Sequence, residues 1–262
     1  MKLSTRMKKY EESFRYRLPR RLPVIVRLDG NSFSKLTKSC DFEKPFDRLF
    51  ENAMDETCIA LLEYCHAEFA YFQSDEISLL LKNGRNQTPF LSNRVQKLTS
   101  LLASTASVAF SQATNTNGVF DARCFILPKH EVVNYFIWRQ EDAFKNCVSS
   151  FAYHGLKSKY GSKKARNMLH GQSTDQRQEI IFQEIGTNVN NIPTHRKRGT
   201  LVESETYEQR IEDVVDDEEK LSSLIEKGHV GSREEIVTRS KWVCKKEIPR
   251  FTQNRSFISD RV

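Results

Sequence analysis

Residues 68–82 read EFAYFQSDEISLLLK. Two apolar runs, 68–72 and 77–82, flank the polar residues Gln73, Ser74, Asp75 and Glu76. Short apolar and aromatic runs on either side of a polar break are typical of a β-hairpin. The stretch therefore predicts a hairpin with these polar residues at its tip.

The segments before and after this hairpin predict two further strands and two helices. Residues 23–28 (PVIVRL) are apolar and β-branched and predict a buried strand that ends at Asp29-Gly30. Apolar residues recur at helical spacing over 46–65 and 93–112, and residues 119–127 predict a further strand. The first 127 residues therefore predict an α+β fold: a ferredoxin-like βαββαβ palm of the polymerase type, with an antiparallel sheet and both helices on one face.

The second half of the chain has weaker patterns. A third helix is expected over 131–150, which would close a palm core of residues 1–150. We expect residues 151–262 to form a basic RNA-contacting region and a mostly helical C-terminal extension that packs on the core. Within it, 155–172 predict a basic loop or short helix, and the acidic stretch 203–226 predicts a solvated helix.

Composition narrows the class of protein. The net charge is +7 and the isoelectric point is about 9.0, which favours an anionic partner such as nucleic acid. The six cysteines form no C-x-x-C pair, so reduced thiols are expected rather than a zinc ribbon or a disulfide scaffold. No apolar run approaches the roughly 18 residues needed to cross a bilayer, and residues 1–21 lack a secretory apolar region. We expect a cytoplasmic protein without membrane partners, with a mitochondrial location left open.

Two aspartates are the strongest candidates for chemistry. Asp29 ends the first strand and Asp75 lies at the hairpin tip, so the predicted topology brings both to one end of the sheet. Two carboxylates and the free carbonyl of Gly30 form a set of hard oxygen ligands that suits Mg²⁺. The alternative is purely structural, because Asp-Gly is a common turn dipeptide and an acidic hairpin tip is ordinary.

A longer set of motifs carries a family resemblance. RLDGNSF at 27–33, FEKP at 42–45 and QSDE at 73–76 are followed by FDAR at 120–123, WRQED at 138–142 and KRGT at 197–200. In this order and spacing they resemble the tRNA-His guanylyltransferase superfamily over roughly residues 10–202. The specific signal is R-L-D-G-x-x-F together with Q-S-D-E.

The resemblance implies a nucleotidyltransferase that uses Mg²⁺, ATP, and GTP or other nucleoside triphosphates, with tRNA as its partner. It implies that Asp29 and Asp75 are catalytic and hold two Mg²⁺ ions with the carbonyl of Gly30, while Glu76 is a weaker candidate ligand. The expected nucleotide contacts are Asn31, Ser32 and Phe33 through their backbone amides, with Lys44, Ser74, Arg94 and Lys97. The candidate RNA contacts are Arg139, Asn146, Lys197 and Arg198.

One departure from the family pattern affects the expected substrate. Eukaryotic members carry His-Ile-Asn-Asn shortly after W-R-Q, whereas residues 144–147 here are Phe-Lys-Asn-Cys and retain only Asn146. The chain thus resembles the guanylyltransferase-like branch of 3′-to-5′ RNA polymerases. The implied activity is templated nucleotide addition to 5′-truncated tRNA by a homotetramer built as a dimer of dimers.

Three other functions stay open at this point. The chain could add a single G at position −1 of the histidine tRNA. It could be another palm enzyme, either a nucleotidyl cyclase or a conventional 5′-to-3′ polymerase. It could also be a non-catalytic RNA-binding protein that retains the palm fold.

Overall fold

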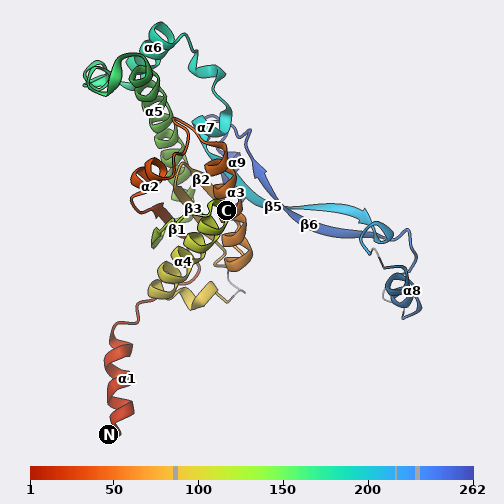
Figure 1. The fold of residues 1–262 in the computed structure, drawn as a ribbon. Coiled ribbons are helices and arrows are strands. Elements are labelled where there is room, and N and C mark those ends of the chain that lie inside the picture. The colour runs from red at the N-terminus through yellow and green to blue at the C-terminus, as the bar shows by residue number, and fades with distance from the viewer. Residues whose placement is uncertain (85–87, 216, 228–230) are drawn as a thin grey trace. The chain divides into compact units, whose positions relative to one another are not determined.

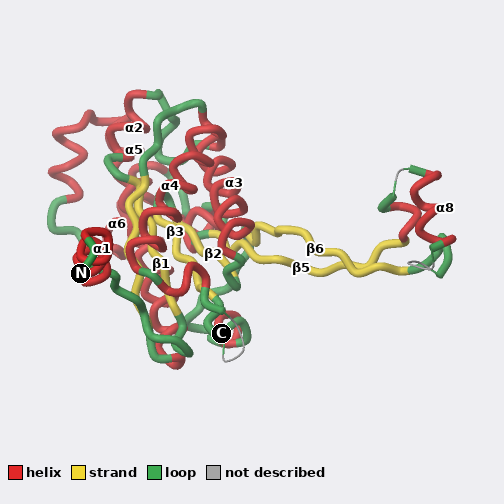
Figure 2. The backbone as a smooth tube through the Cα atoms, turned by 90° about the horizontal axis from the view of Figure 1, so that it is seen from below, coloured by secondary structure: helices red, strands yellow, loops and turns green. Residues whose placement is uncertain are grey.

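The computed structural model describes residues 1–84, 88–215, 217–227 and 231–262. The chain divides into a main unit, residues 1–202 with 244–262, and a second unit, residues 203–243. The strand order is β4-β1-β3-β2-β5-β6. Strands β1, β2, β3, β5 and β6 are labelled in Figures 1 and 2. The strands are β1 Val24–Gly30, β2 Phe69–Gln73, β3 Glu76–Leu81, β4 Phe120–Ile126, β5 Thr200–Arg210 and β6 Ile236–Lys245.

The two helices predicted over 46–65 and 93–112 are present, and two helices that were not predicted precede them. The α-helices are α1 Leu3–Ser13, α2 Phe33–Ser39, α3 Arg48–Cys65, α4 Val95–Thr114, α5 Val132–Leu169, α6 Thr174–Ile180, α7 Thr194–Arg198, α8 Glu218–Glu226 and α9 Ser256–Ser259. Short helical turns lie at Phe90–Asn93, Lys129–Glu131, Ile181–Ile185, Val189–Asn191 and Ile211–Asp213. The α+β fold is confirmed, because β1, α3, β2, β3, α4 and β4 reproduce the βαββαβ order. None of the described helices is long and apolar enough to cross a membrane.

Strand β1 lies inside the sheet, and side chains on its two faces pack into different layers of the core. It pairs antiparallel with β3 on one side and β4 on the other. Ile25 and its cross-strand partner Leu80 pack with Phe69 of β2 against Val132 and Phe136 near the start of α5. Because side chains alternate along a strand, the neighbouring residues of β1 point to the opposite layer. Helices α3 and α4 lie against each other, with α3 contacting β2 and α4 contacting β1 and β4.

The C-terminal segment returns to the main unit through polar contacts with α5 and α7. The side chain of Gln140 accepts a hydrogen bond from the Phe251 amide at 2.8 Å and donates to the Pro249 carbonyl at 3.0 Å. The Arg198 guanidinium donates to the Ile248 carbonyl at 2.9 Å. The segment after β6 thereby becomes part of the same core as the palm.

Two expectations for the second half were wrong. The stretch 155–172 is mostly helix, since α5 runs on from Val132 to Leu169 and crosses the palm boundary expected at residue 150. Its helical geometry is interrupted at Gly161, which has φ 80°. Residues 203–210 form the greater part of β5, not an acidic helix, and α8 is helical only from Glu218. The side chains of 203–210 alternate between half-buried and exposed, which is the period of a strand.

Gly199 is a position where the fold needs glycine. Its φ is 77° and its ψ is −177°, and a Cβ there would lie 2.6 Å from the Phe72 carbonyl oxygen and 2.6 Å from the Tyr71 hydroxyl. Gly199→Ala should lower the free energy of unfolding by about 3 kcal/mol or more. Gly171→Ala is the control. Gly171 also has a positive φ of 72°, but a Cβ added there would have no neighbour within 4 Å, so the substitution should cost only about 1 kcal/mol. Urea denaturation measures both, and equal losses would contradict this account.

Candidate active site

The predicted carboxylates meet at one end of the sheet. Asp29 lies opposite Glu76 in the β1–β3 pair, and the Gly30 amide donates to the Asp75 carbonyl at 3.2 Å. Ser74 and Asp75 form the two-residue turn between β2 and β3, and Ser74 has φ 51°. The hairpin tip is therefore fastened to the end of β1, and the sequence prediction that Asp29 and Asp75 converge is confirmed.

Gly30 allows this close approach. A Cβ on Gly30 would lie 2.8 Å from the Asp75 carboxylate oxygen Oδ2 and 2.5 Å from the Phe33 ring. Contacts under about 3 Å are not tolerated by a packed backbone, so any larger residue would push Asp75 or Phe33 away. The glycine of the RLDG motif thus places a carboxylate directly against the loop backbone.

Phe33 anchors the loop after β1, and its ring forms part of the apolar wall of the site. The ring is buried among Phe50 of α3, Phe110 of α4 and Phe120 of β4, at centroid distances of 4.9–6.1 Å. The backbone amide of Asn31, which we expected to contact the nucleotide, is already used, because it donates to the Val119 carbonyl at 2.7 Å. Ser32, with φ 59°, and the first turn of α2 remain as the exposed part of this loop.

Glu76 and Arg139 are paired with each other. One nitrogen of the Arg139 guanidinium lies 2.7 and 2.9 Å from the two carboxylate oxygens of Glu76, and the Arg139 side chain is only 4% exposed. Arg139 therefore cannot act as the surface RNA contact expected from sequence, because α5 packs it into the protein. Glu76 is already neutralised by a cation, which leaves Asp29 and Asp75 as the carboxylates available to a metal.

The electrostatics at Asp75 fit a cation. Burial is the main cause that raises the pKa of its carboxyl group, and the charges of Asp29 and Glu76 raise it further. The Ser74 hydroxyl lies 3.1 Å from Asp75 Oδ1 and acts in the opposite direction. A divalent cation would relieve this repulsion, and oxygen ligands from two aspartates and one carbonyl suit Mg²⁺. The described residues contain no group of three or more His, Cys, Asp or Glu side chains arranged to hold a metal.

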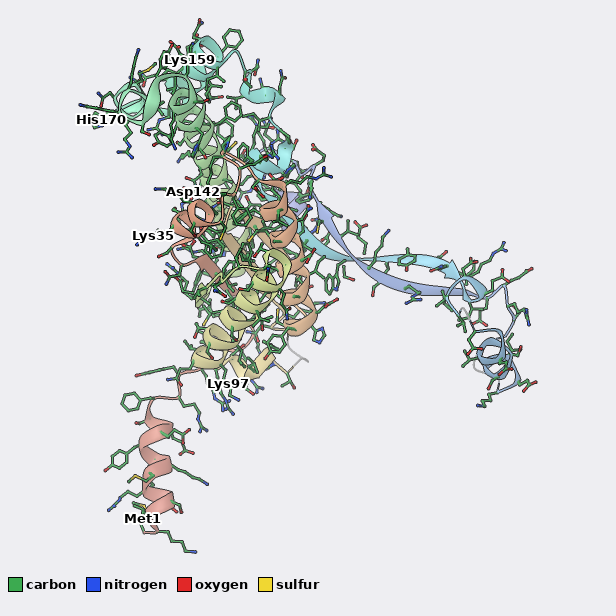
Figure 3. All side chains as sticks on the ribbon, in the orientation of Figure 1. Met1, Lys35, Lys97, Asp142, Lys159 and His170 are labelled. Carbon is green, nitrogen blue, oxygen red and sulfur yellow. The ribbon has the colours of Figure 1, made fainter. Side chains whose placement is uncertain are left out.

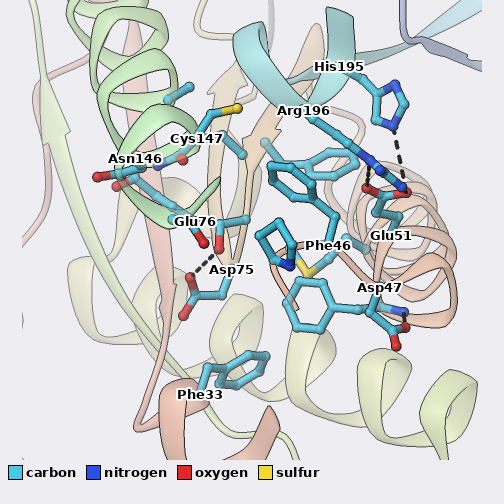
Figure 4. A pocket seen from close by; sticks show the side chains of 18 of the residues that line it. Phe33, Phe46, Asp47, Glu51, Asp75, Glu76, Asn146, Cys147, His195 and Arg196 are labelled. Atoms are coloured by element: carbon cyan, nitrogen blue, oxygen red, sulfur yellow. Dashed lines mark hydrogen bonds and ion pairs between the residues drawn. The ribbon is translucent and has the colours of Figure 1, made fainter. Parts of the chain in front are cut away.

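A cavity of about 460 Å³ opens beside these carboxylates (Figure 4). Lys44 lines it, and its ammonium donates to the Thr37 hydroxyl at 2.7 Å. Burial lowers the pKa of Lys44, although Asp47 and Asp75 act against that shift. Asn146 also lines the cavity, 3.4 Å from an Asp142 carboxylate oxygen. Lys44, Ser74 and Asn146 are thus brought to the site with Asp29 and Asp75.

The sequence reasoning missed the opposite wall of the cavity. Glu51 of α3 accepts from the Arg196 guanidinium at 2.6 and 3.1 Å, and His195 Nε2 lies 3.6 Å from the same carboxylate (Figure 4). Burial alone would raise the pKa of Glu51, but hydrogen bonds from His195 and Arg196 outweigh it and hold the pKa at about 2. The basic cluster before KRGT was visible in the sequence, but its partner lies about 145 residues earlier.

Four expected contacts do not reach the cavity. Lys197 is buried and donates to the Asn190 carbonyl at 2.7 Å, and Arg198 holds the C-terminal segment. Arg94 and Lys97 lie at the start of α4, whereas the end of α4 leads to the site. About 25 Å of helix therefore separates Lys97 from the site within one chain, and Lys97 lies well away from Asp142 in Figure 3.

Comparison with known proteins identifies this site. The family model described as tRNAHis guanylyltransferase matches residues 4–128, and the model of its C-terminal domain matches residues 130–246. The chain belongs to the tRNA-His guanylyltransferase family. It is therefore a nucleotidyltransferase, and the family's activity is nucleotide addition at the 5′ end of tRNA. The resemblance read from the motifs is confirmed at the level of the family.

Individual relatives support the assignment to this family. A probable tRNA(His) guanylyltransferase from Drosophila melanogaster is 32% identical over 68% of this chain, and the match covers 66% of that longer protein. The structure of a bacterial tRNA(His) guanylyltransferase-like protein in complex with ATP has a TM-score of 0.80 and 31% identity, and covers 100% of this chain and 99% of its own. The crystal structure of the Saccharomyces cerevisiae enzyme has a TM-score of 0.65 and 26% identity, with 73% of this chain and 90% of its own covered.

The raised pKa of Asp75 predicts a stability effect of Asp75→Asn. In the absence of metal at pH 7 the variant should be more stable than the wild type, because an amide replaces a disfavoured anion. The gain should disappear below pH 3.8, where the carboxyl is protonated in both states. Mg²⁺ should stabilise the wild type but not the variant in thermal denaturation. Asp41→Asn, at an exposed loop position, is the control and should show neither effect.

The low pKa of Glu51 predicts acid sensitivity. Its ion pairs stabilise the fold above pH 4.5, the ordinary value, and this contribution is lost as the pH falls from 4.5 toward 2. Relative to Glu51→Gln, the wild type should lose on the order of 1–2 kcal/mol of unfolding free energy over that range, after solvent screening. Parallel pH profiles of the two proteins in urea denaturation would rule this out.

Proposed function

We propose that this enzyme adds nucleotides in the 3′-to-5′ direction to 5′-truncated tRNA, with the complementary strand as template. The observation that carries the proposal is the convergence of Asp29 and Asp75 on Gly30 beside a 460 Å³ cavity. Assignment to the guanylyltransferase-like branch is supported by the sequence at 144–147. It is also supported by the likeness to the bacterial guanylyltransferase-like protein, which extends over the whole chain.

Asp29, Asp75 and the Gly30 carbonyl would hold Mg²⁺. When bound, the metal would supply neutralisation of the phosphate charge and of the departing pyrophosphate. ATP and GTP are bound in structures of the bacterial guanylyltransferase-like protein, and we assign nucleoside triphosphates to the same cavity here. Lys44 would contact phosphate as a point charge, because it lines the cavity and its ammonium donates to the neutral Thr37 hydroxyl.

The reaction proceeds in two transfers when the RNA begins with a 5′-monophosphate and in one transfer when it begins with a 5′-triphosphate. When the RNA begins with a 5′-monophosphate, a phosphate oxygen attacks the α-phosphorus of ATP, and pyrophosphate leaves. The 3′-hydroxyl oxygen of the incoming nucleotide then attacks the activated 5′-phosphorus. AMP leaves, or pyrophosphate leaves when the RNA carries a 5′-triphosphate, and the hydroxyl proton goes to solvent.

Arg94 and Lys97 can take part only in an assembly. Because α4 holds them about 25–30 Å from the site of their own chain, a role in binding triphosphate or the RNA 5′ end requires a second copy. This agrees with a homotetramer built as a dimer of dimers, which we retain as part of the proposal. Light scattering measures the assembly directly.

A narrower function is the runner-up. The relatives from Drosophila melanogaster and Candida glabrata are named tRNA(His) guanylyltransferases, at 32% and 33% identity. Such an enzyme would add one G at position −1 of the histidine tRNA. The retained Asn146, which lines the cavity, is the feature that keeps this alternative.

An extension assay separates these functions. The 3′-labelled tRNAs, either 5′-truncated or complete histidine tRNA, are incubated with each nucleoside triphosphate and Mg²⁺. We expect templated growth at the 5′ end of several truncated tRNAs, and at least a 1000-fold loss in Asp29→Ala and Asp75→Ala with RNA binding retained. Addition of a single G to histidine tRNA alone would favour the runner-up. Growth at the 3′ end, or a cyclic product from nucleotide alone, would overturn the proposal.

A further inference from the structure

Trp138 is an exposed aromatic residue beside the active site that the activity described above does not use. It is 51% exposed, although it belongs to the otherwise well-packed first half of α5. It lies one helical turn before Asp142, which lines the cavity, and one turn after Tyr135, whose ring centroid is 5.9 Å away. The ring therefore reaches the surface next to the cavity without lining it.

A single guanidinium connects Trp138 to the carboxylates. The Arg139 guanidinium carbon lies 3.5 Å from the centroid of the Trp138 ring, and the same group lies 2.7 Å from Glu76. Glu76 is the direct cross-strand partner of Asp29. The indole is thus held by a cation–π contact one side chain away from the proposed metal ligands.

A second cation lies beside the indole. Arg27 precedes Asp29 by two residues on β1, so both side chains project from the same face of the sheet. Its guanidinium carbon is 5.9 Å from the Trp138 ring centroid. Its Nε is buried without a hydrogen-bond partner, and among the described residues no carboxylate lies within ion-pair distance of it. Because the Arg27 residue as a whole is only half-buried, its charge can be reached by an anion from outside.

We propose that Trp138 is the stacking platform for a base at the 5′ end of the substrate RNA, with Arg27 bound to an adjacent phosphate. An aromatic face next to an uncompensated cation lets a protein hold a nucleotide by base stacking and phosphate charge without reading its sequence. The inference rests on the proposed function, because that function brings an RNA 5′ end to Asp29 and Asp75. It adds the surface on which the terminal nucleotide is oriented.

The two tryptophans of the chain allow a direct optical test. Trp242 lies in β6, within the second unit, so Trp242→Phe leaves Trp138 as the sole indole, and Trp138→Phe leaves Trp242. The probe is a 5′-phosphorylated RNA hairpin that lacks its first 5′ nucleotide, labelled with fluorescein at its 3′ end. Tryptophan emission reports stacking, and fluorescein anisotropy reports RNA binding independently of catalysis.

We expect RNA to quench the emission of the Trp242→Phe protein in a saturable manner and to leave that of Trp138→Phe unchanged. Trp138→Ala should bind the hairpin about 10-fold more weakly or worse, and Trp138→Phe, which keeps an aromatic face, should lose less. In the transfer assay Trp138→Ala should raise KM for RNA while KM for the nucleoside triphosphate stays the same. Arg27→Gln should weaken binding and reduce its dependence on salt.

Several outcomes overturn the inference. Binding by anisotropy without quenching of Trp138 would show that RNA does not reach this ring, and would leave the proposed function intact. A change in Trp138 emission with protein concentration alone would show that a second copy covers the ring. Absence of RNA binding by wild-type protein would overturn both the proposed function and this inference. Circular dichroism of each variant establishes that the fold is retained.

Discussion

Three carboxylates share one end of the sheet, and the local structure is organised around their repulsion. Asp29 and Glu76 are fixed side by side by the β1–β3 register, and Asp75 is fastened to Gly30 by a backbone hydrogen bond. Among the described residues, a buried cation lies against one of the three, since Arg139 pairs with Glu76. Removing one member of such a buried pair costs about 3–5 kcal/mol, so this match is maintained by the fold. Asp29 and Asp75 are left to a ligand that the protein does not itself provide.

Helix α5 supplies many of the side chains that surround these carboxylates. Arg139 neutralises Glu76, and the next residue, Gln140, binds the C-terminal segment at two backbone positions. The Trp138 ring lies against the Arg139 guanidinium, and Asp142 and Asn146 line the cavity. One helix thus links the position of the C-terminal segment to the charge balance of the active site. A change that shifts α5 would alter both together.

The parts of the site that follow from local patterns could be predicted from the sequence. The hairpin tip and the strand before Asp29 have clear apolar runs, and their topology places Asp29 and Asp75 together without knowledge of any side-chain contact. The resemblance of the motifs to a known family then indicated a nucleotidyltransferase. The β5 strand was misread because a high density of acidic residues obscured its two-residue alternation.

The errors at basic residues share one physical cause. Charge is visible in a sequence, but burial and the partner of a side chain are not. Arg139 and Lys197 looked like RNA contacts, yet packing encloses both and gives them partners in the same chain. The wall formed by Glu51 and Arg196 joins residues far apart in sequence, and no local pattern predicts such a contact. Trp138 belongs to the WRQED motif, but its exposure and its two arginine neighbours are what suggest a role.

The central claim is that Asp29 and Asp75 with the Gly30 carbonyl form the metal site, while Glu76 stays paired with Arg139. The most direct measurement is the anomalous diffraction of Mn²⁺ in crystals of this protein soaked with a non-hydrolysable nucleoside triphosphate analogue. The account predicts a manganese peak bonded to both aspartates and to the Gly30 oxygen, with the Glu76–Arg139 pair unchanged. A peak bonded to Glu76 with Arg139 displaced, or no peak at this end of the sheet, would contradict it.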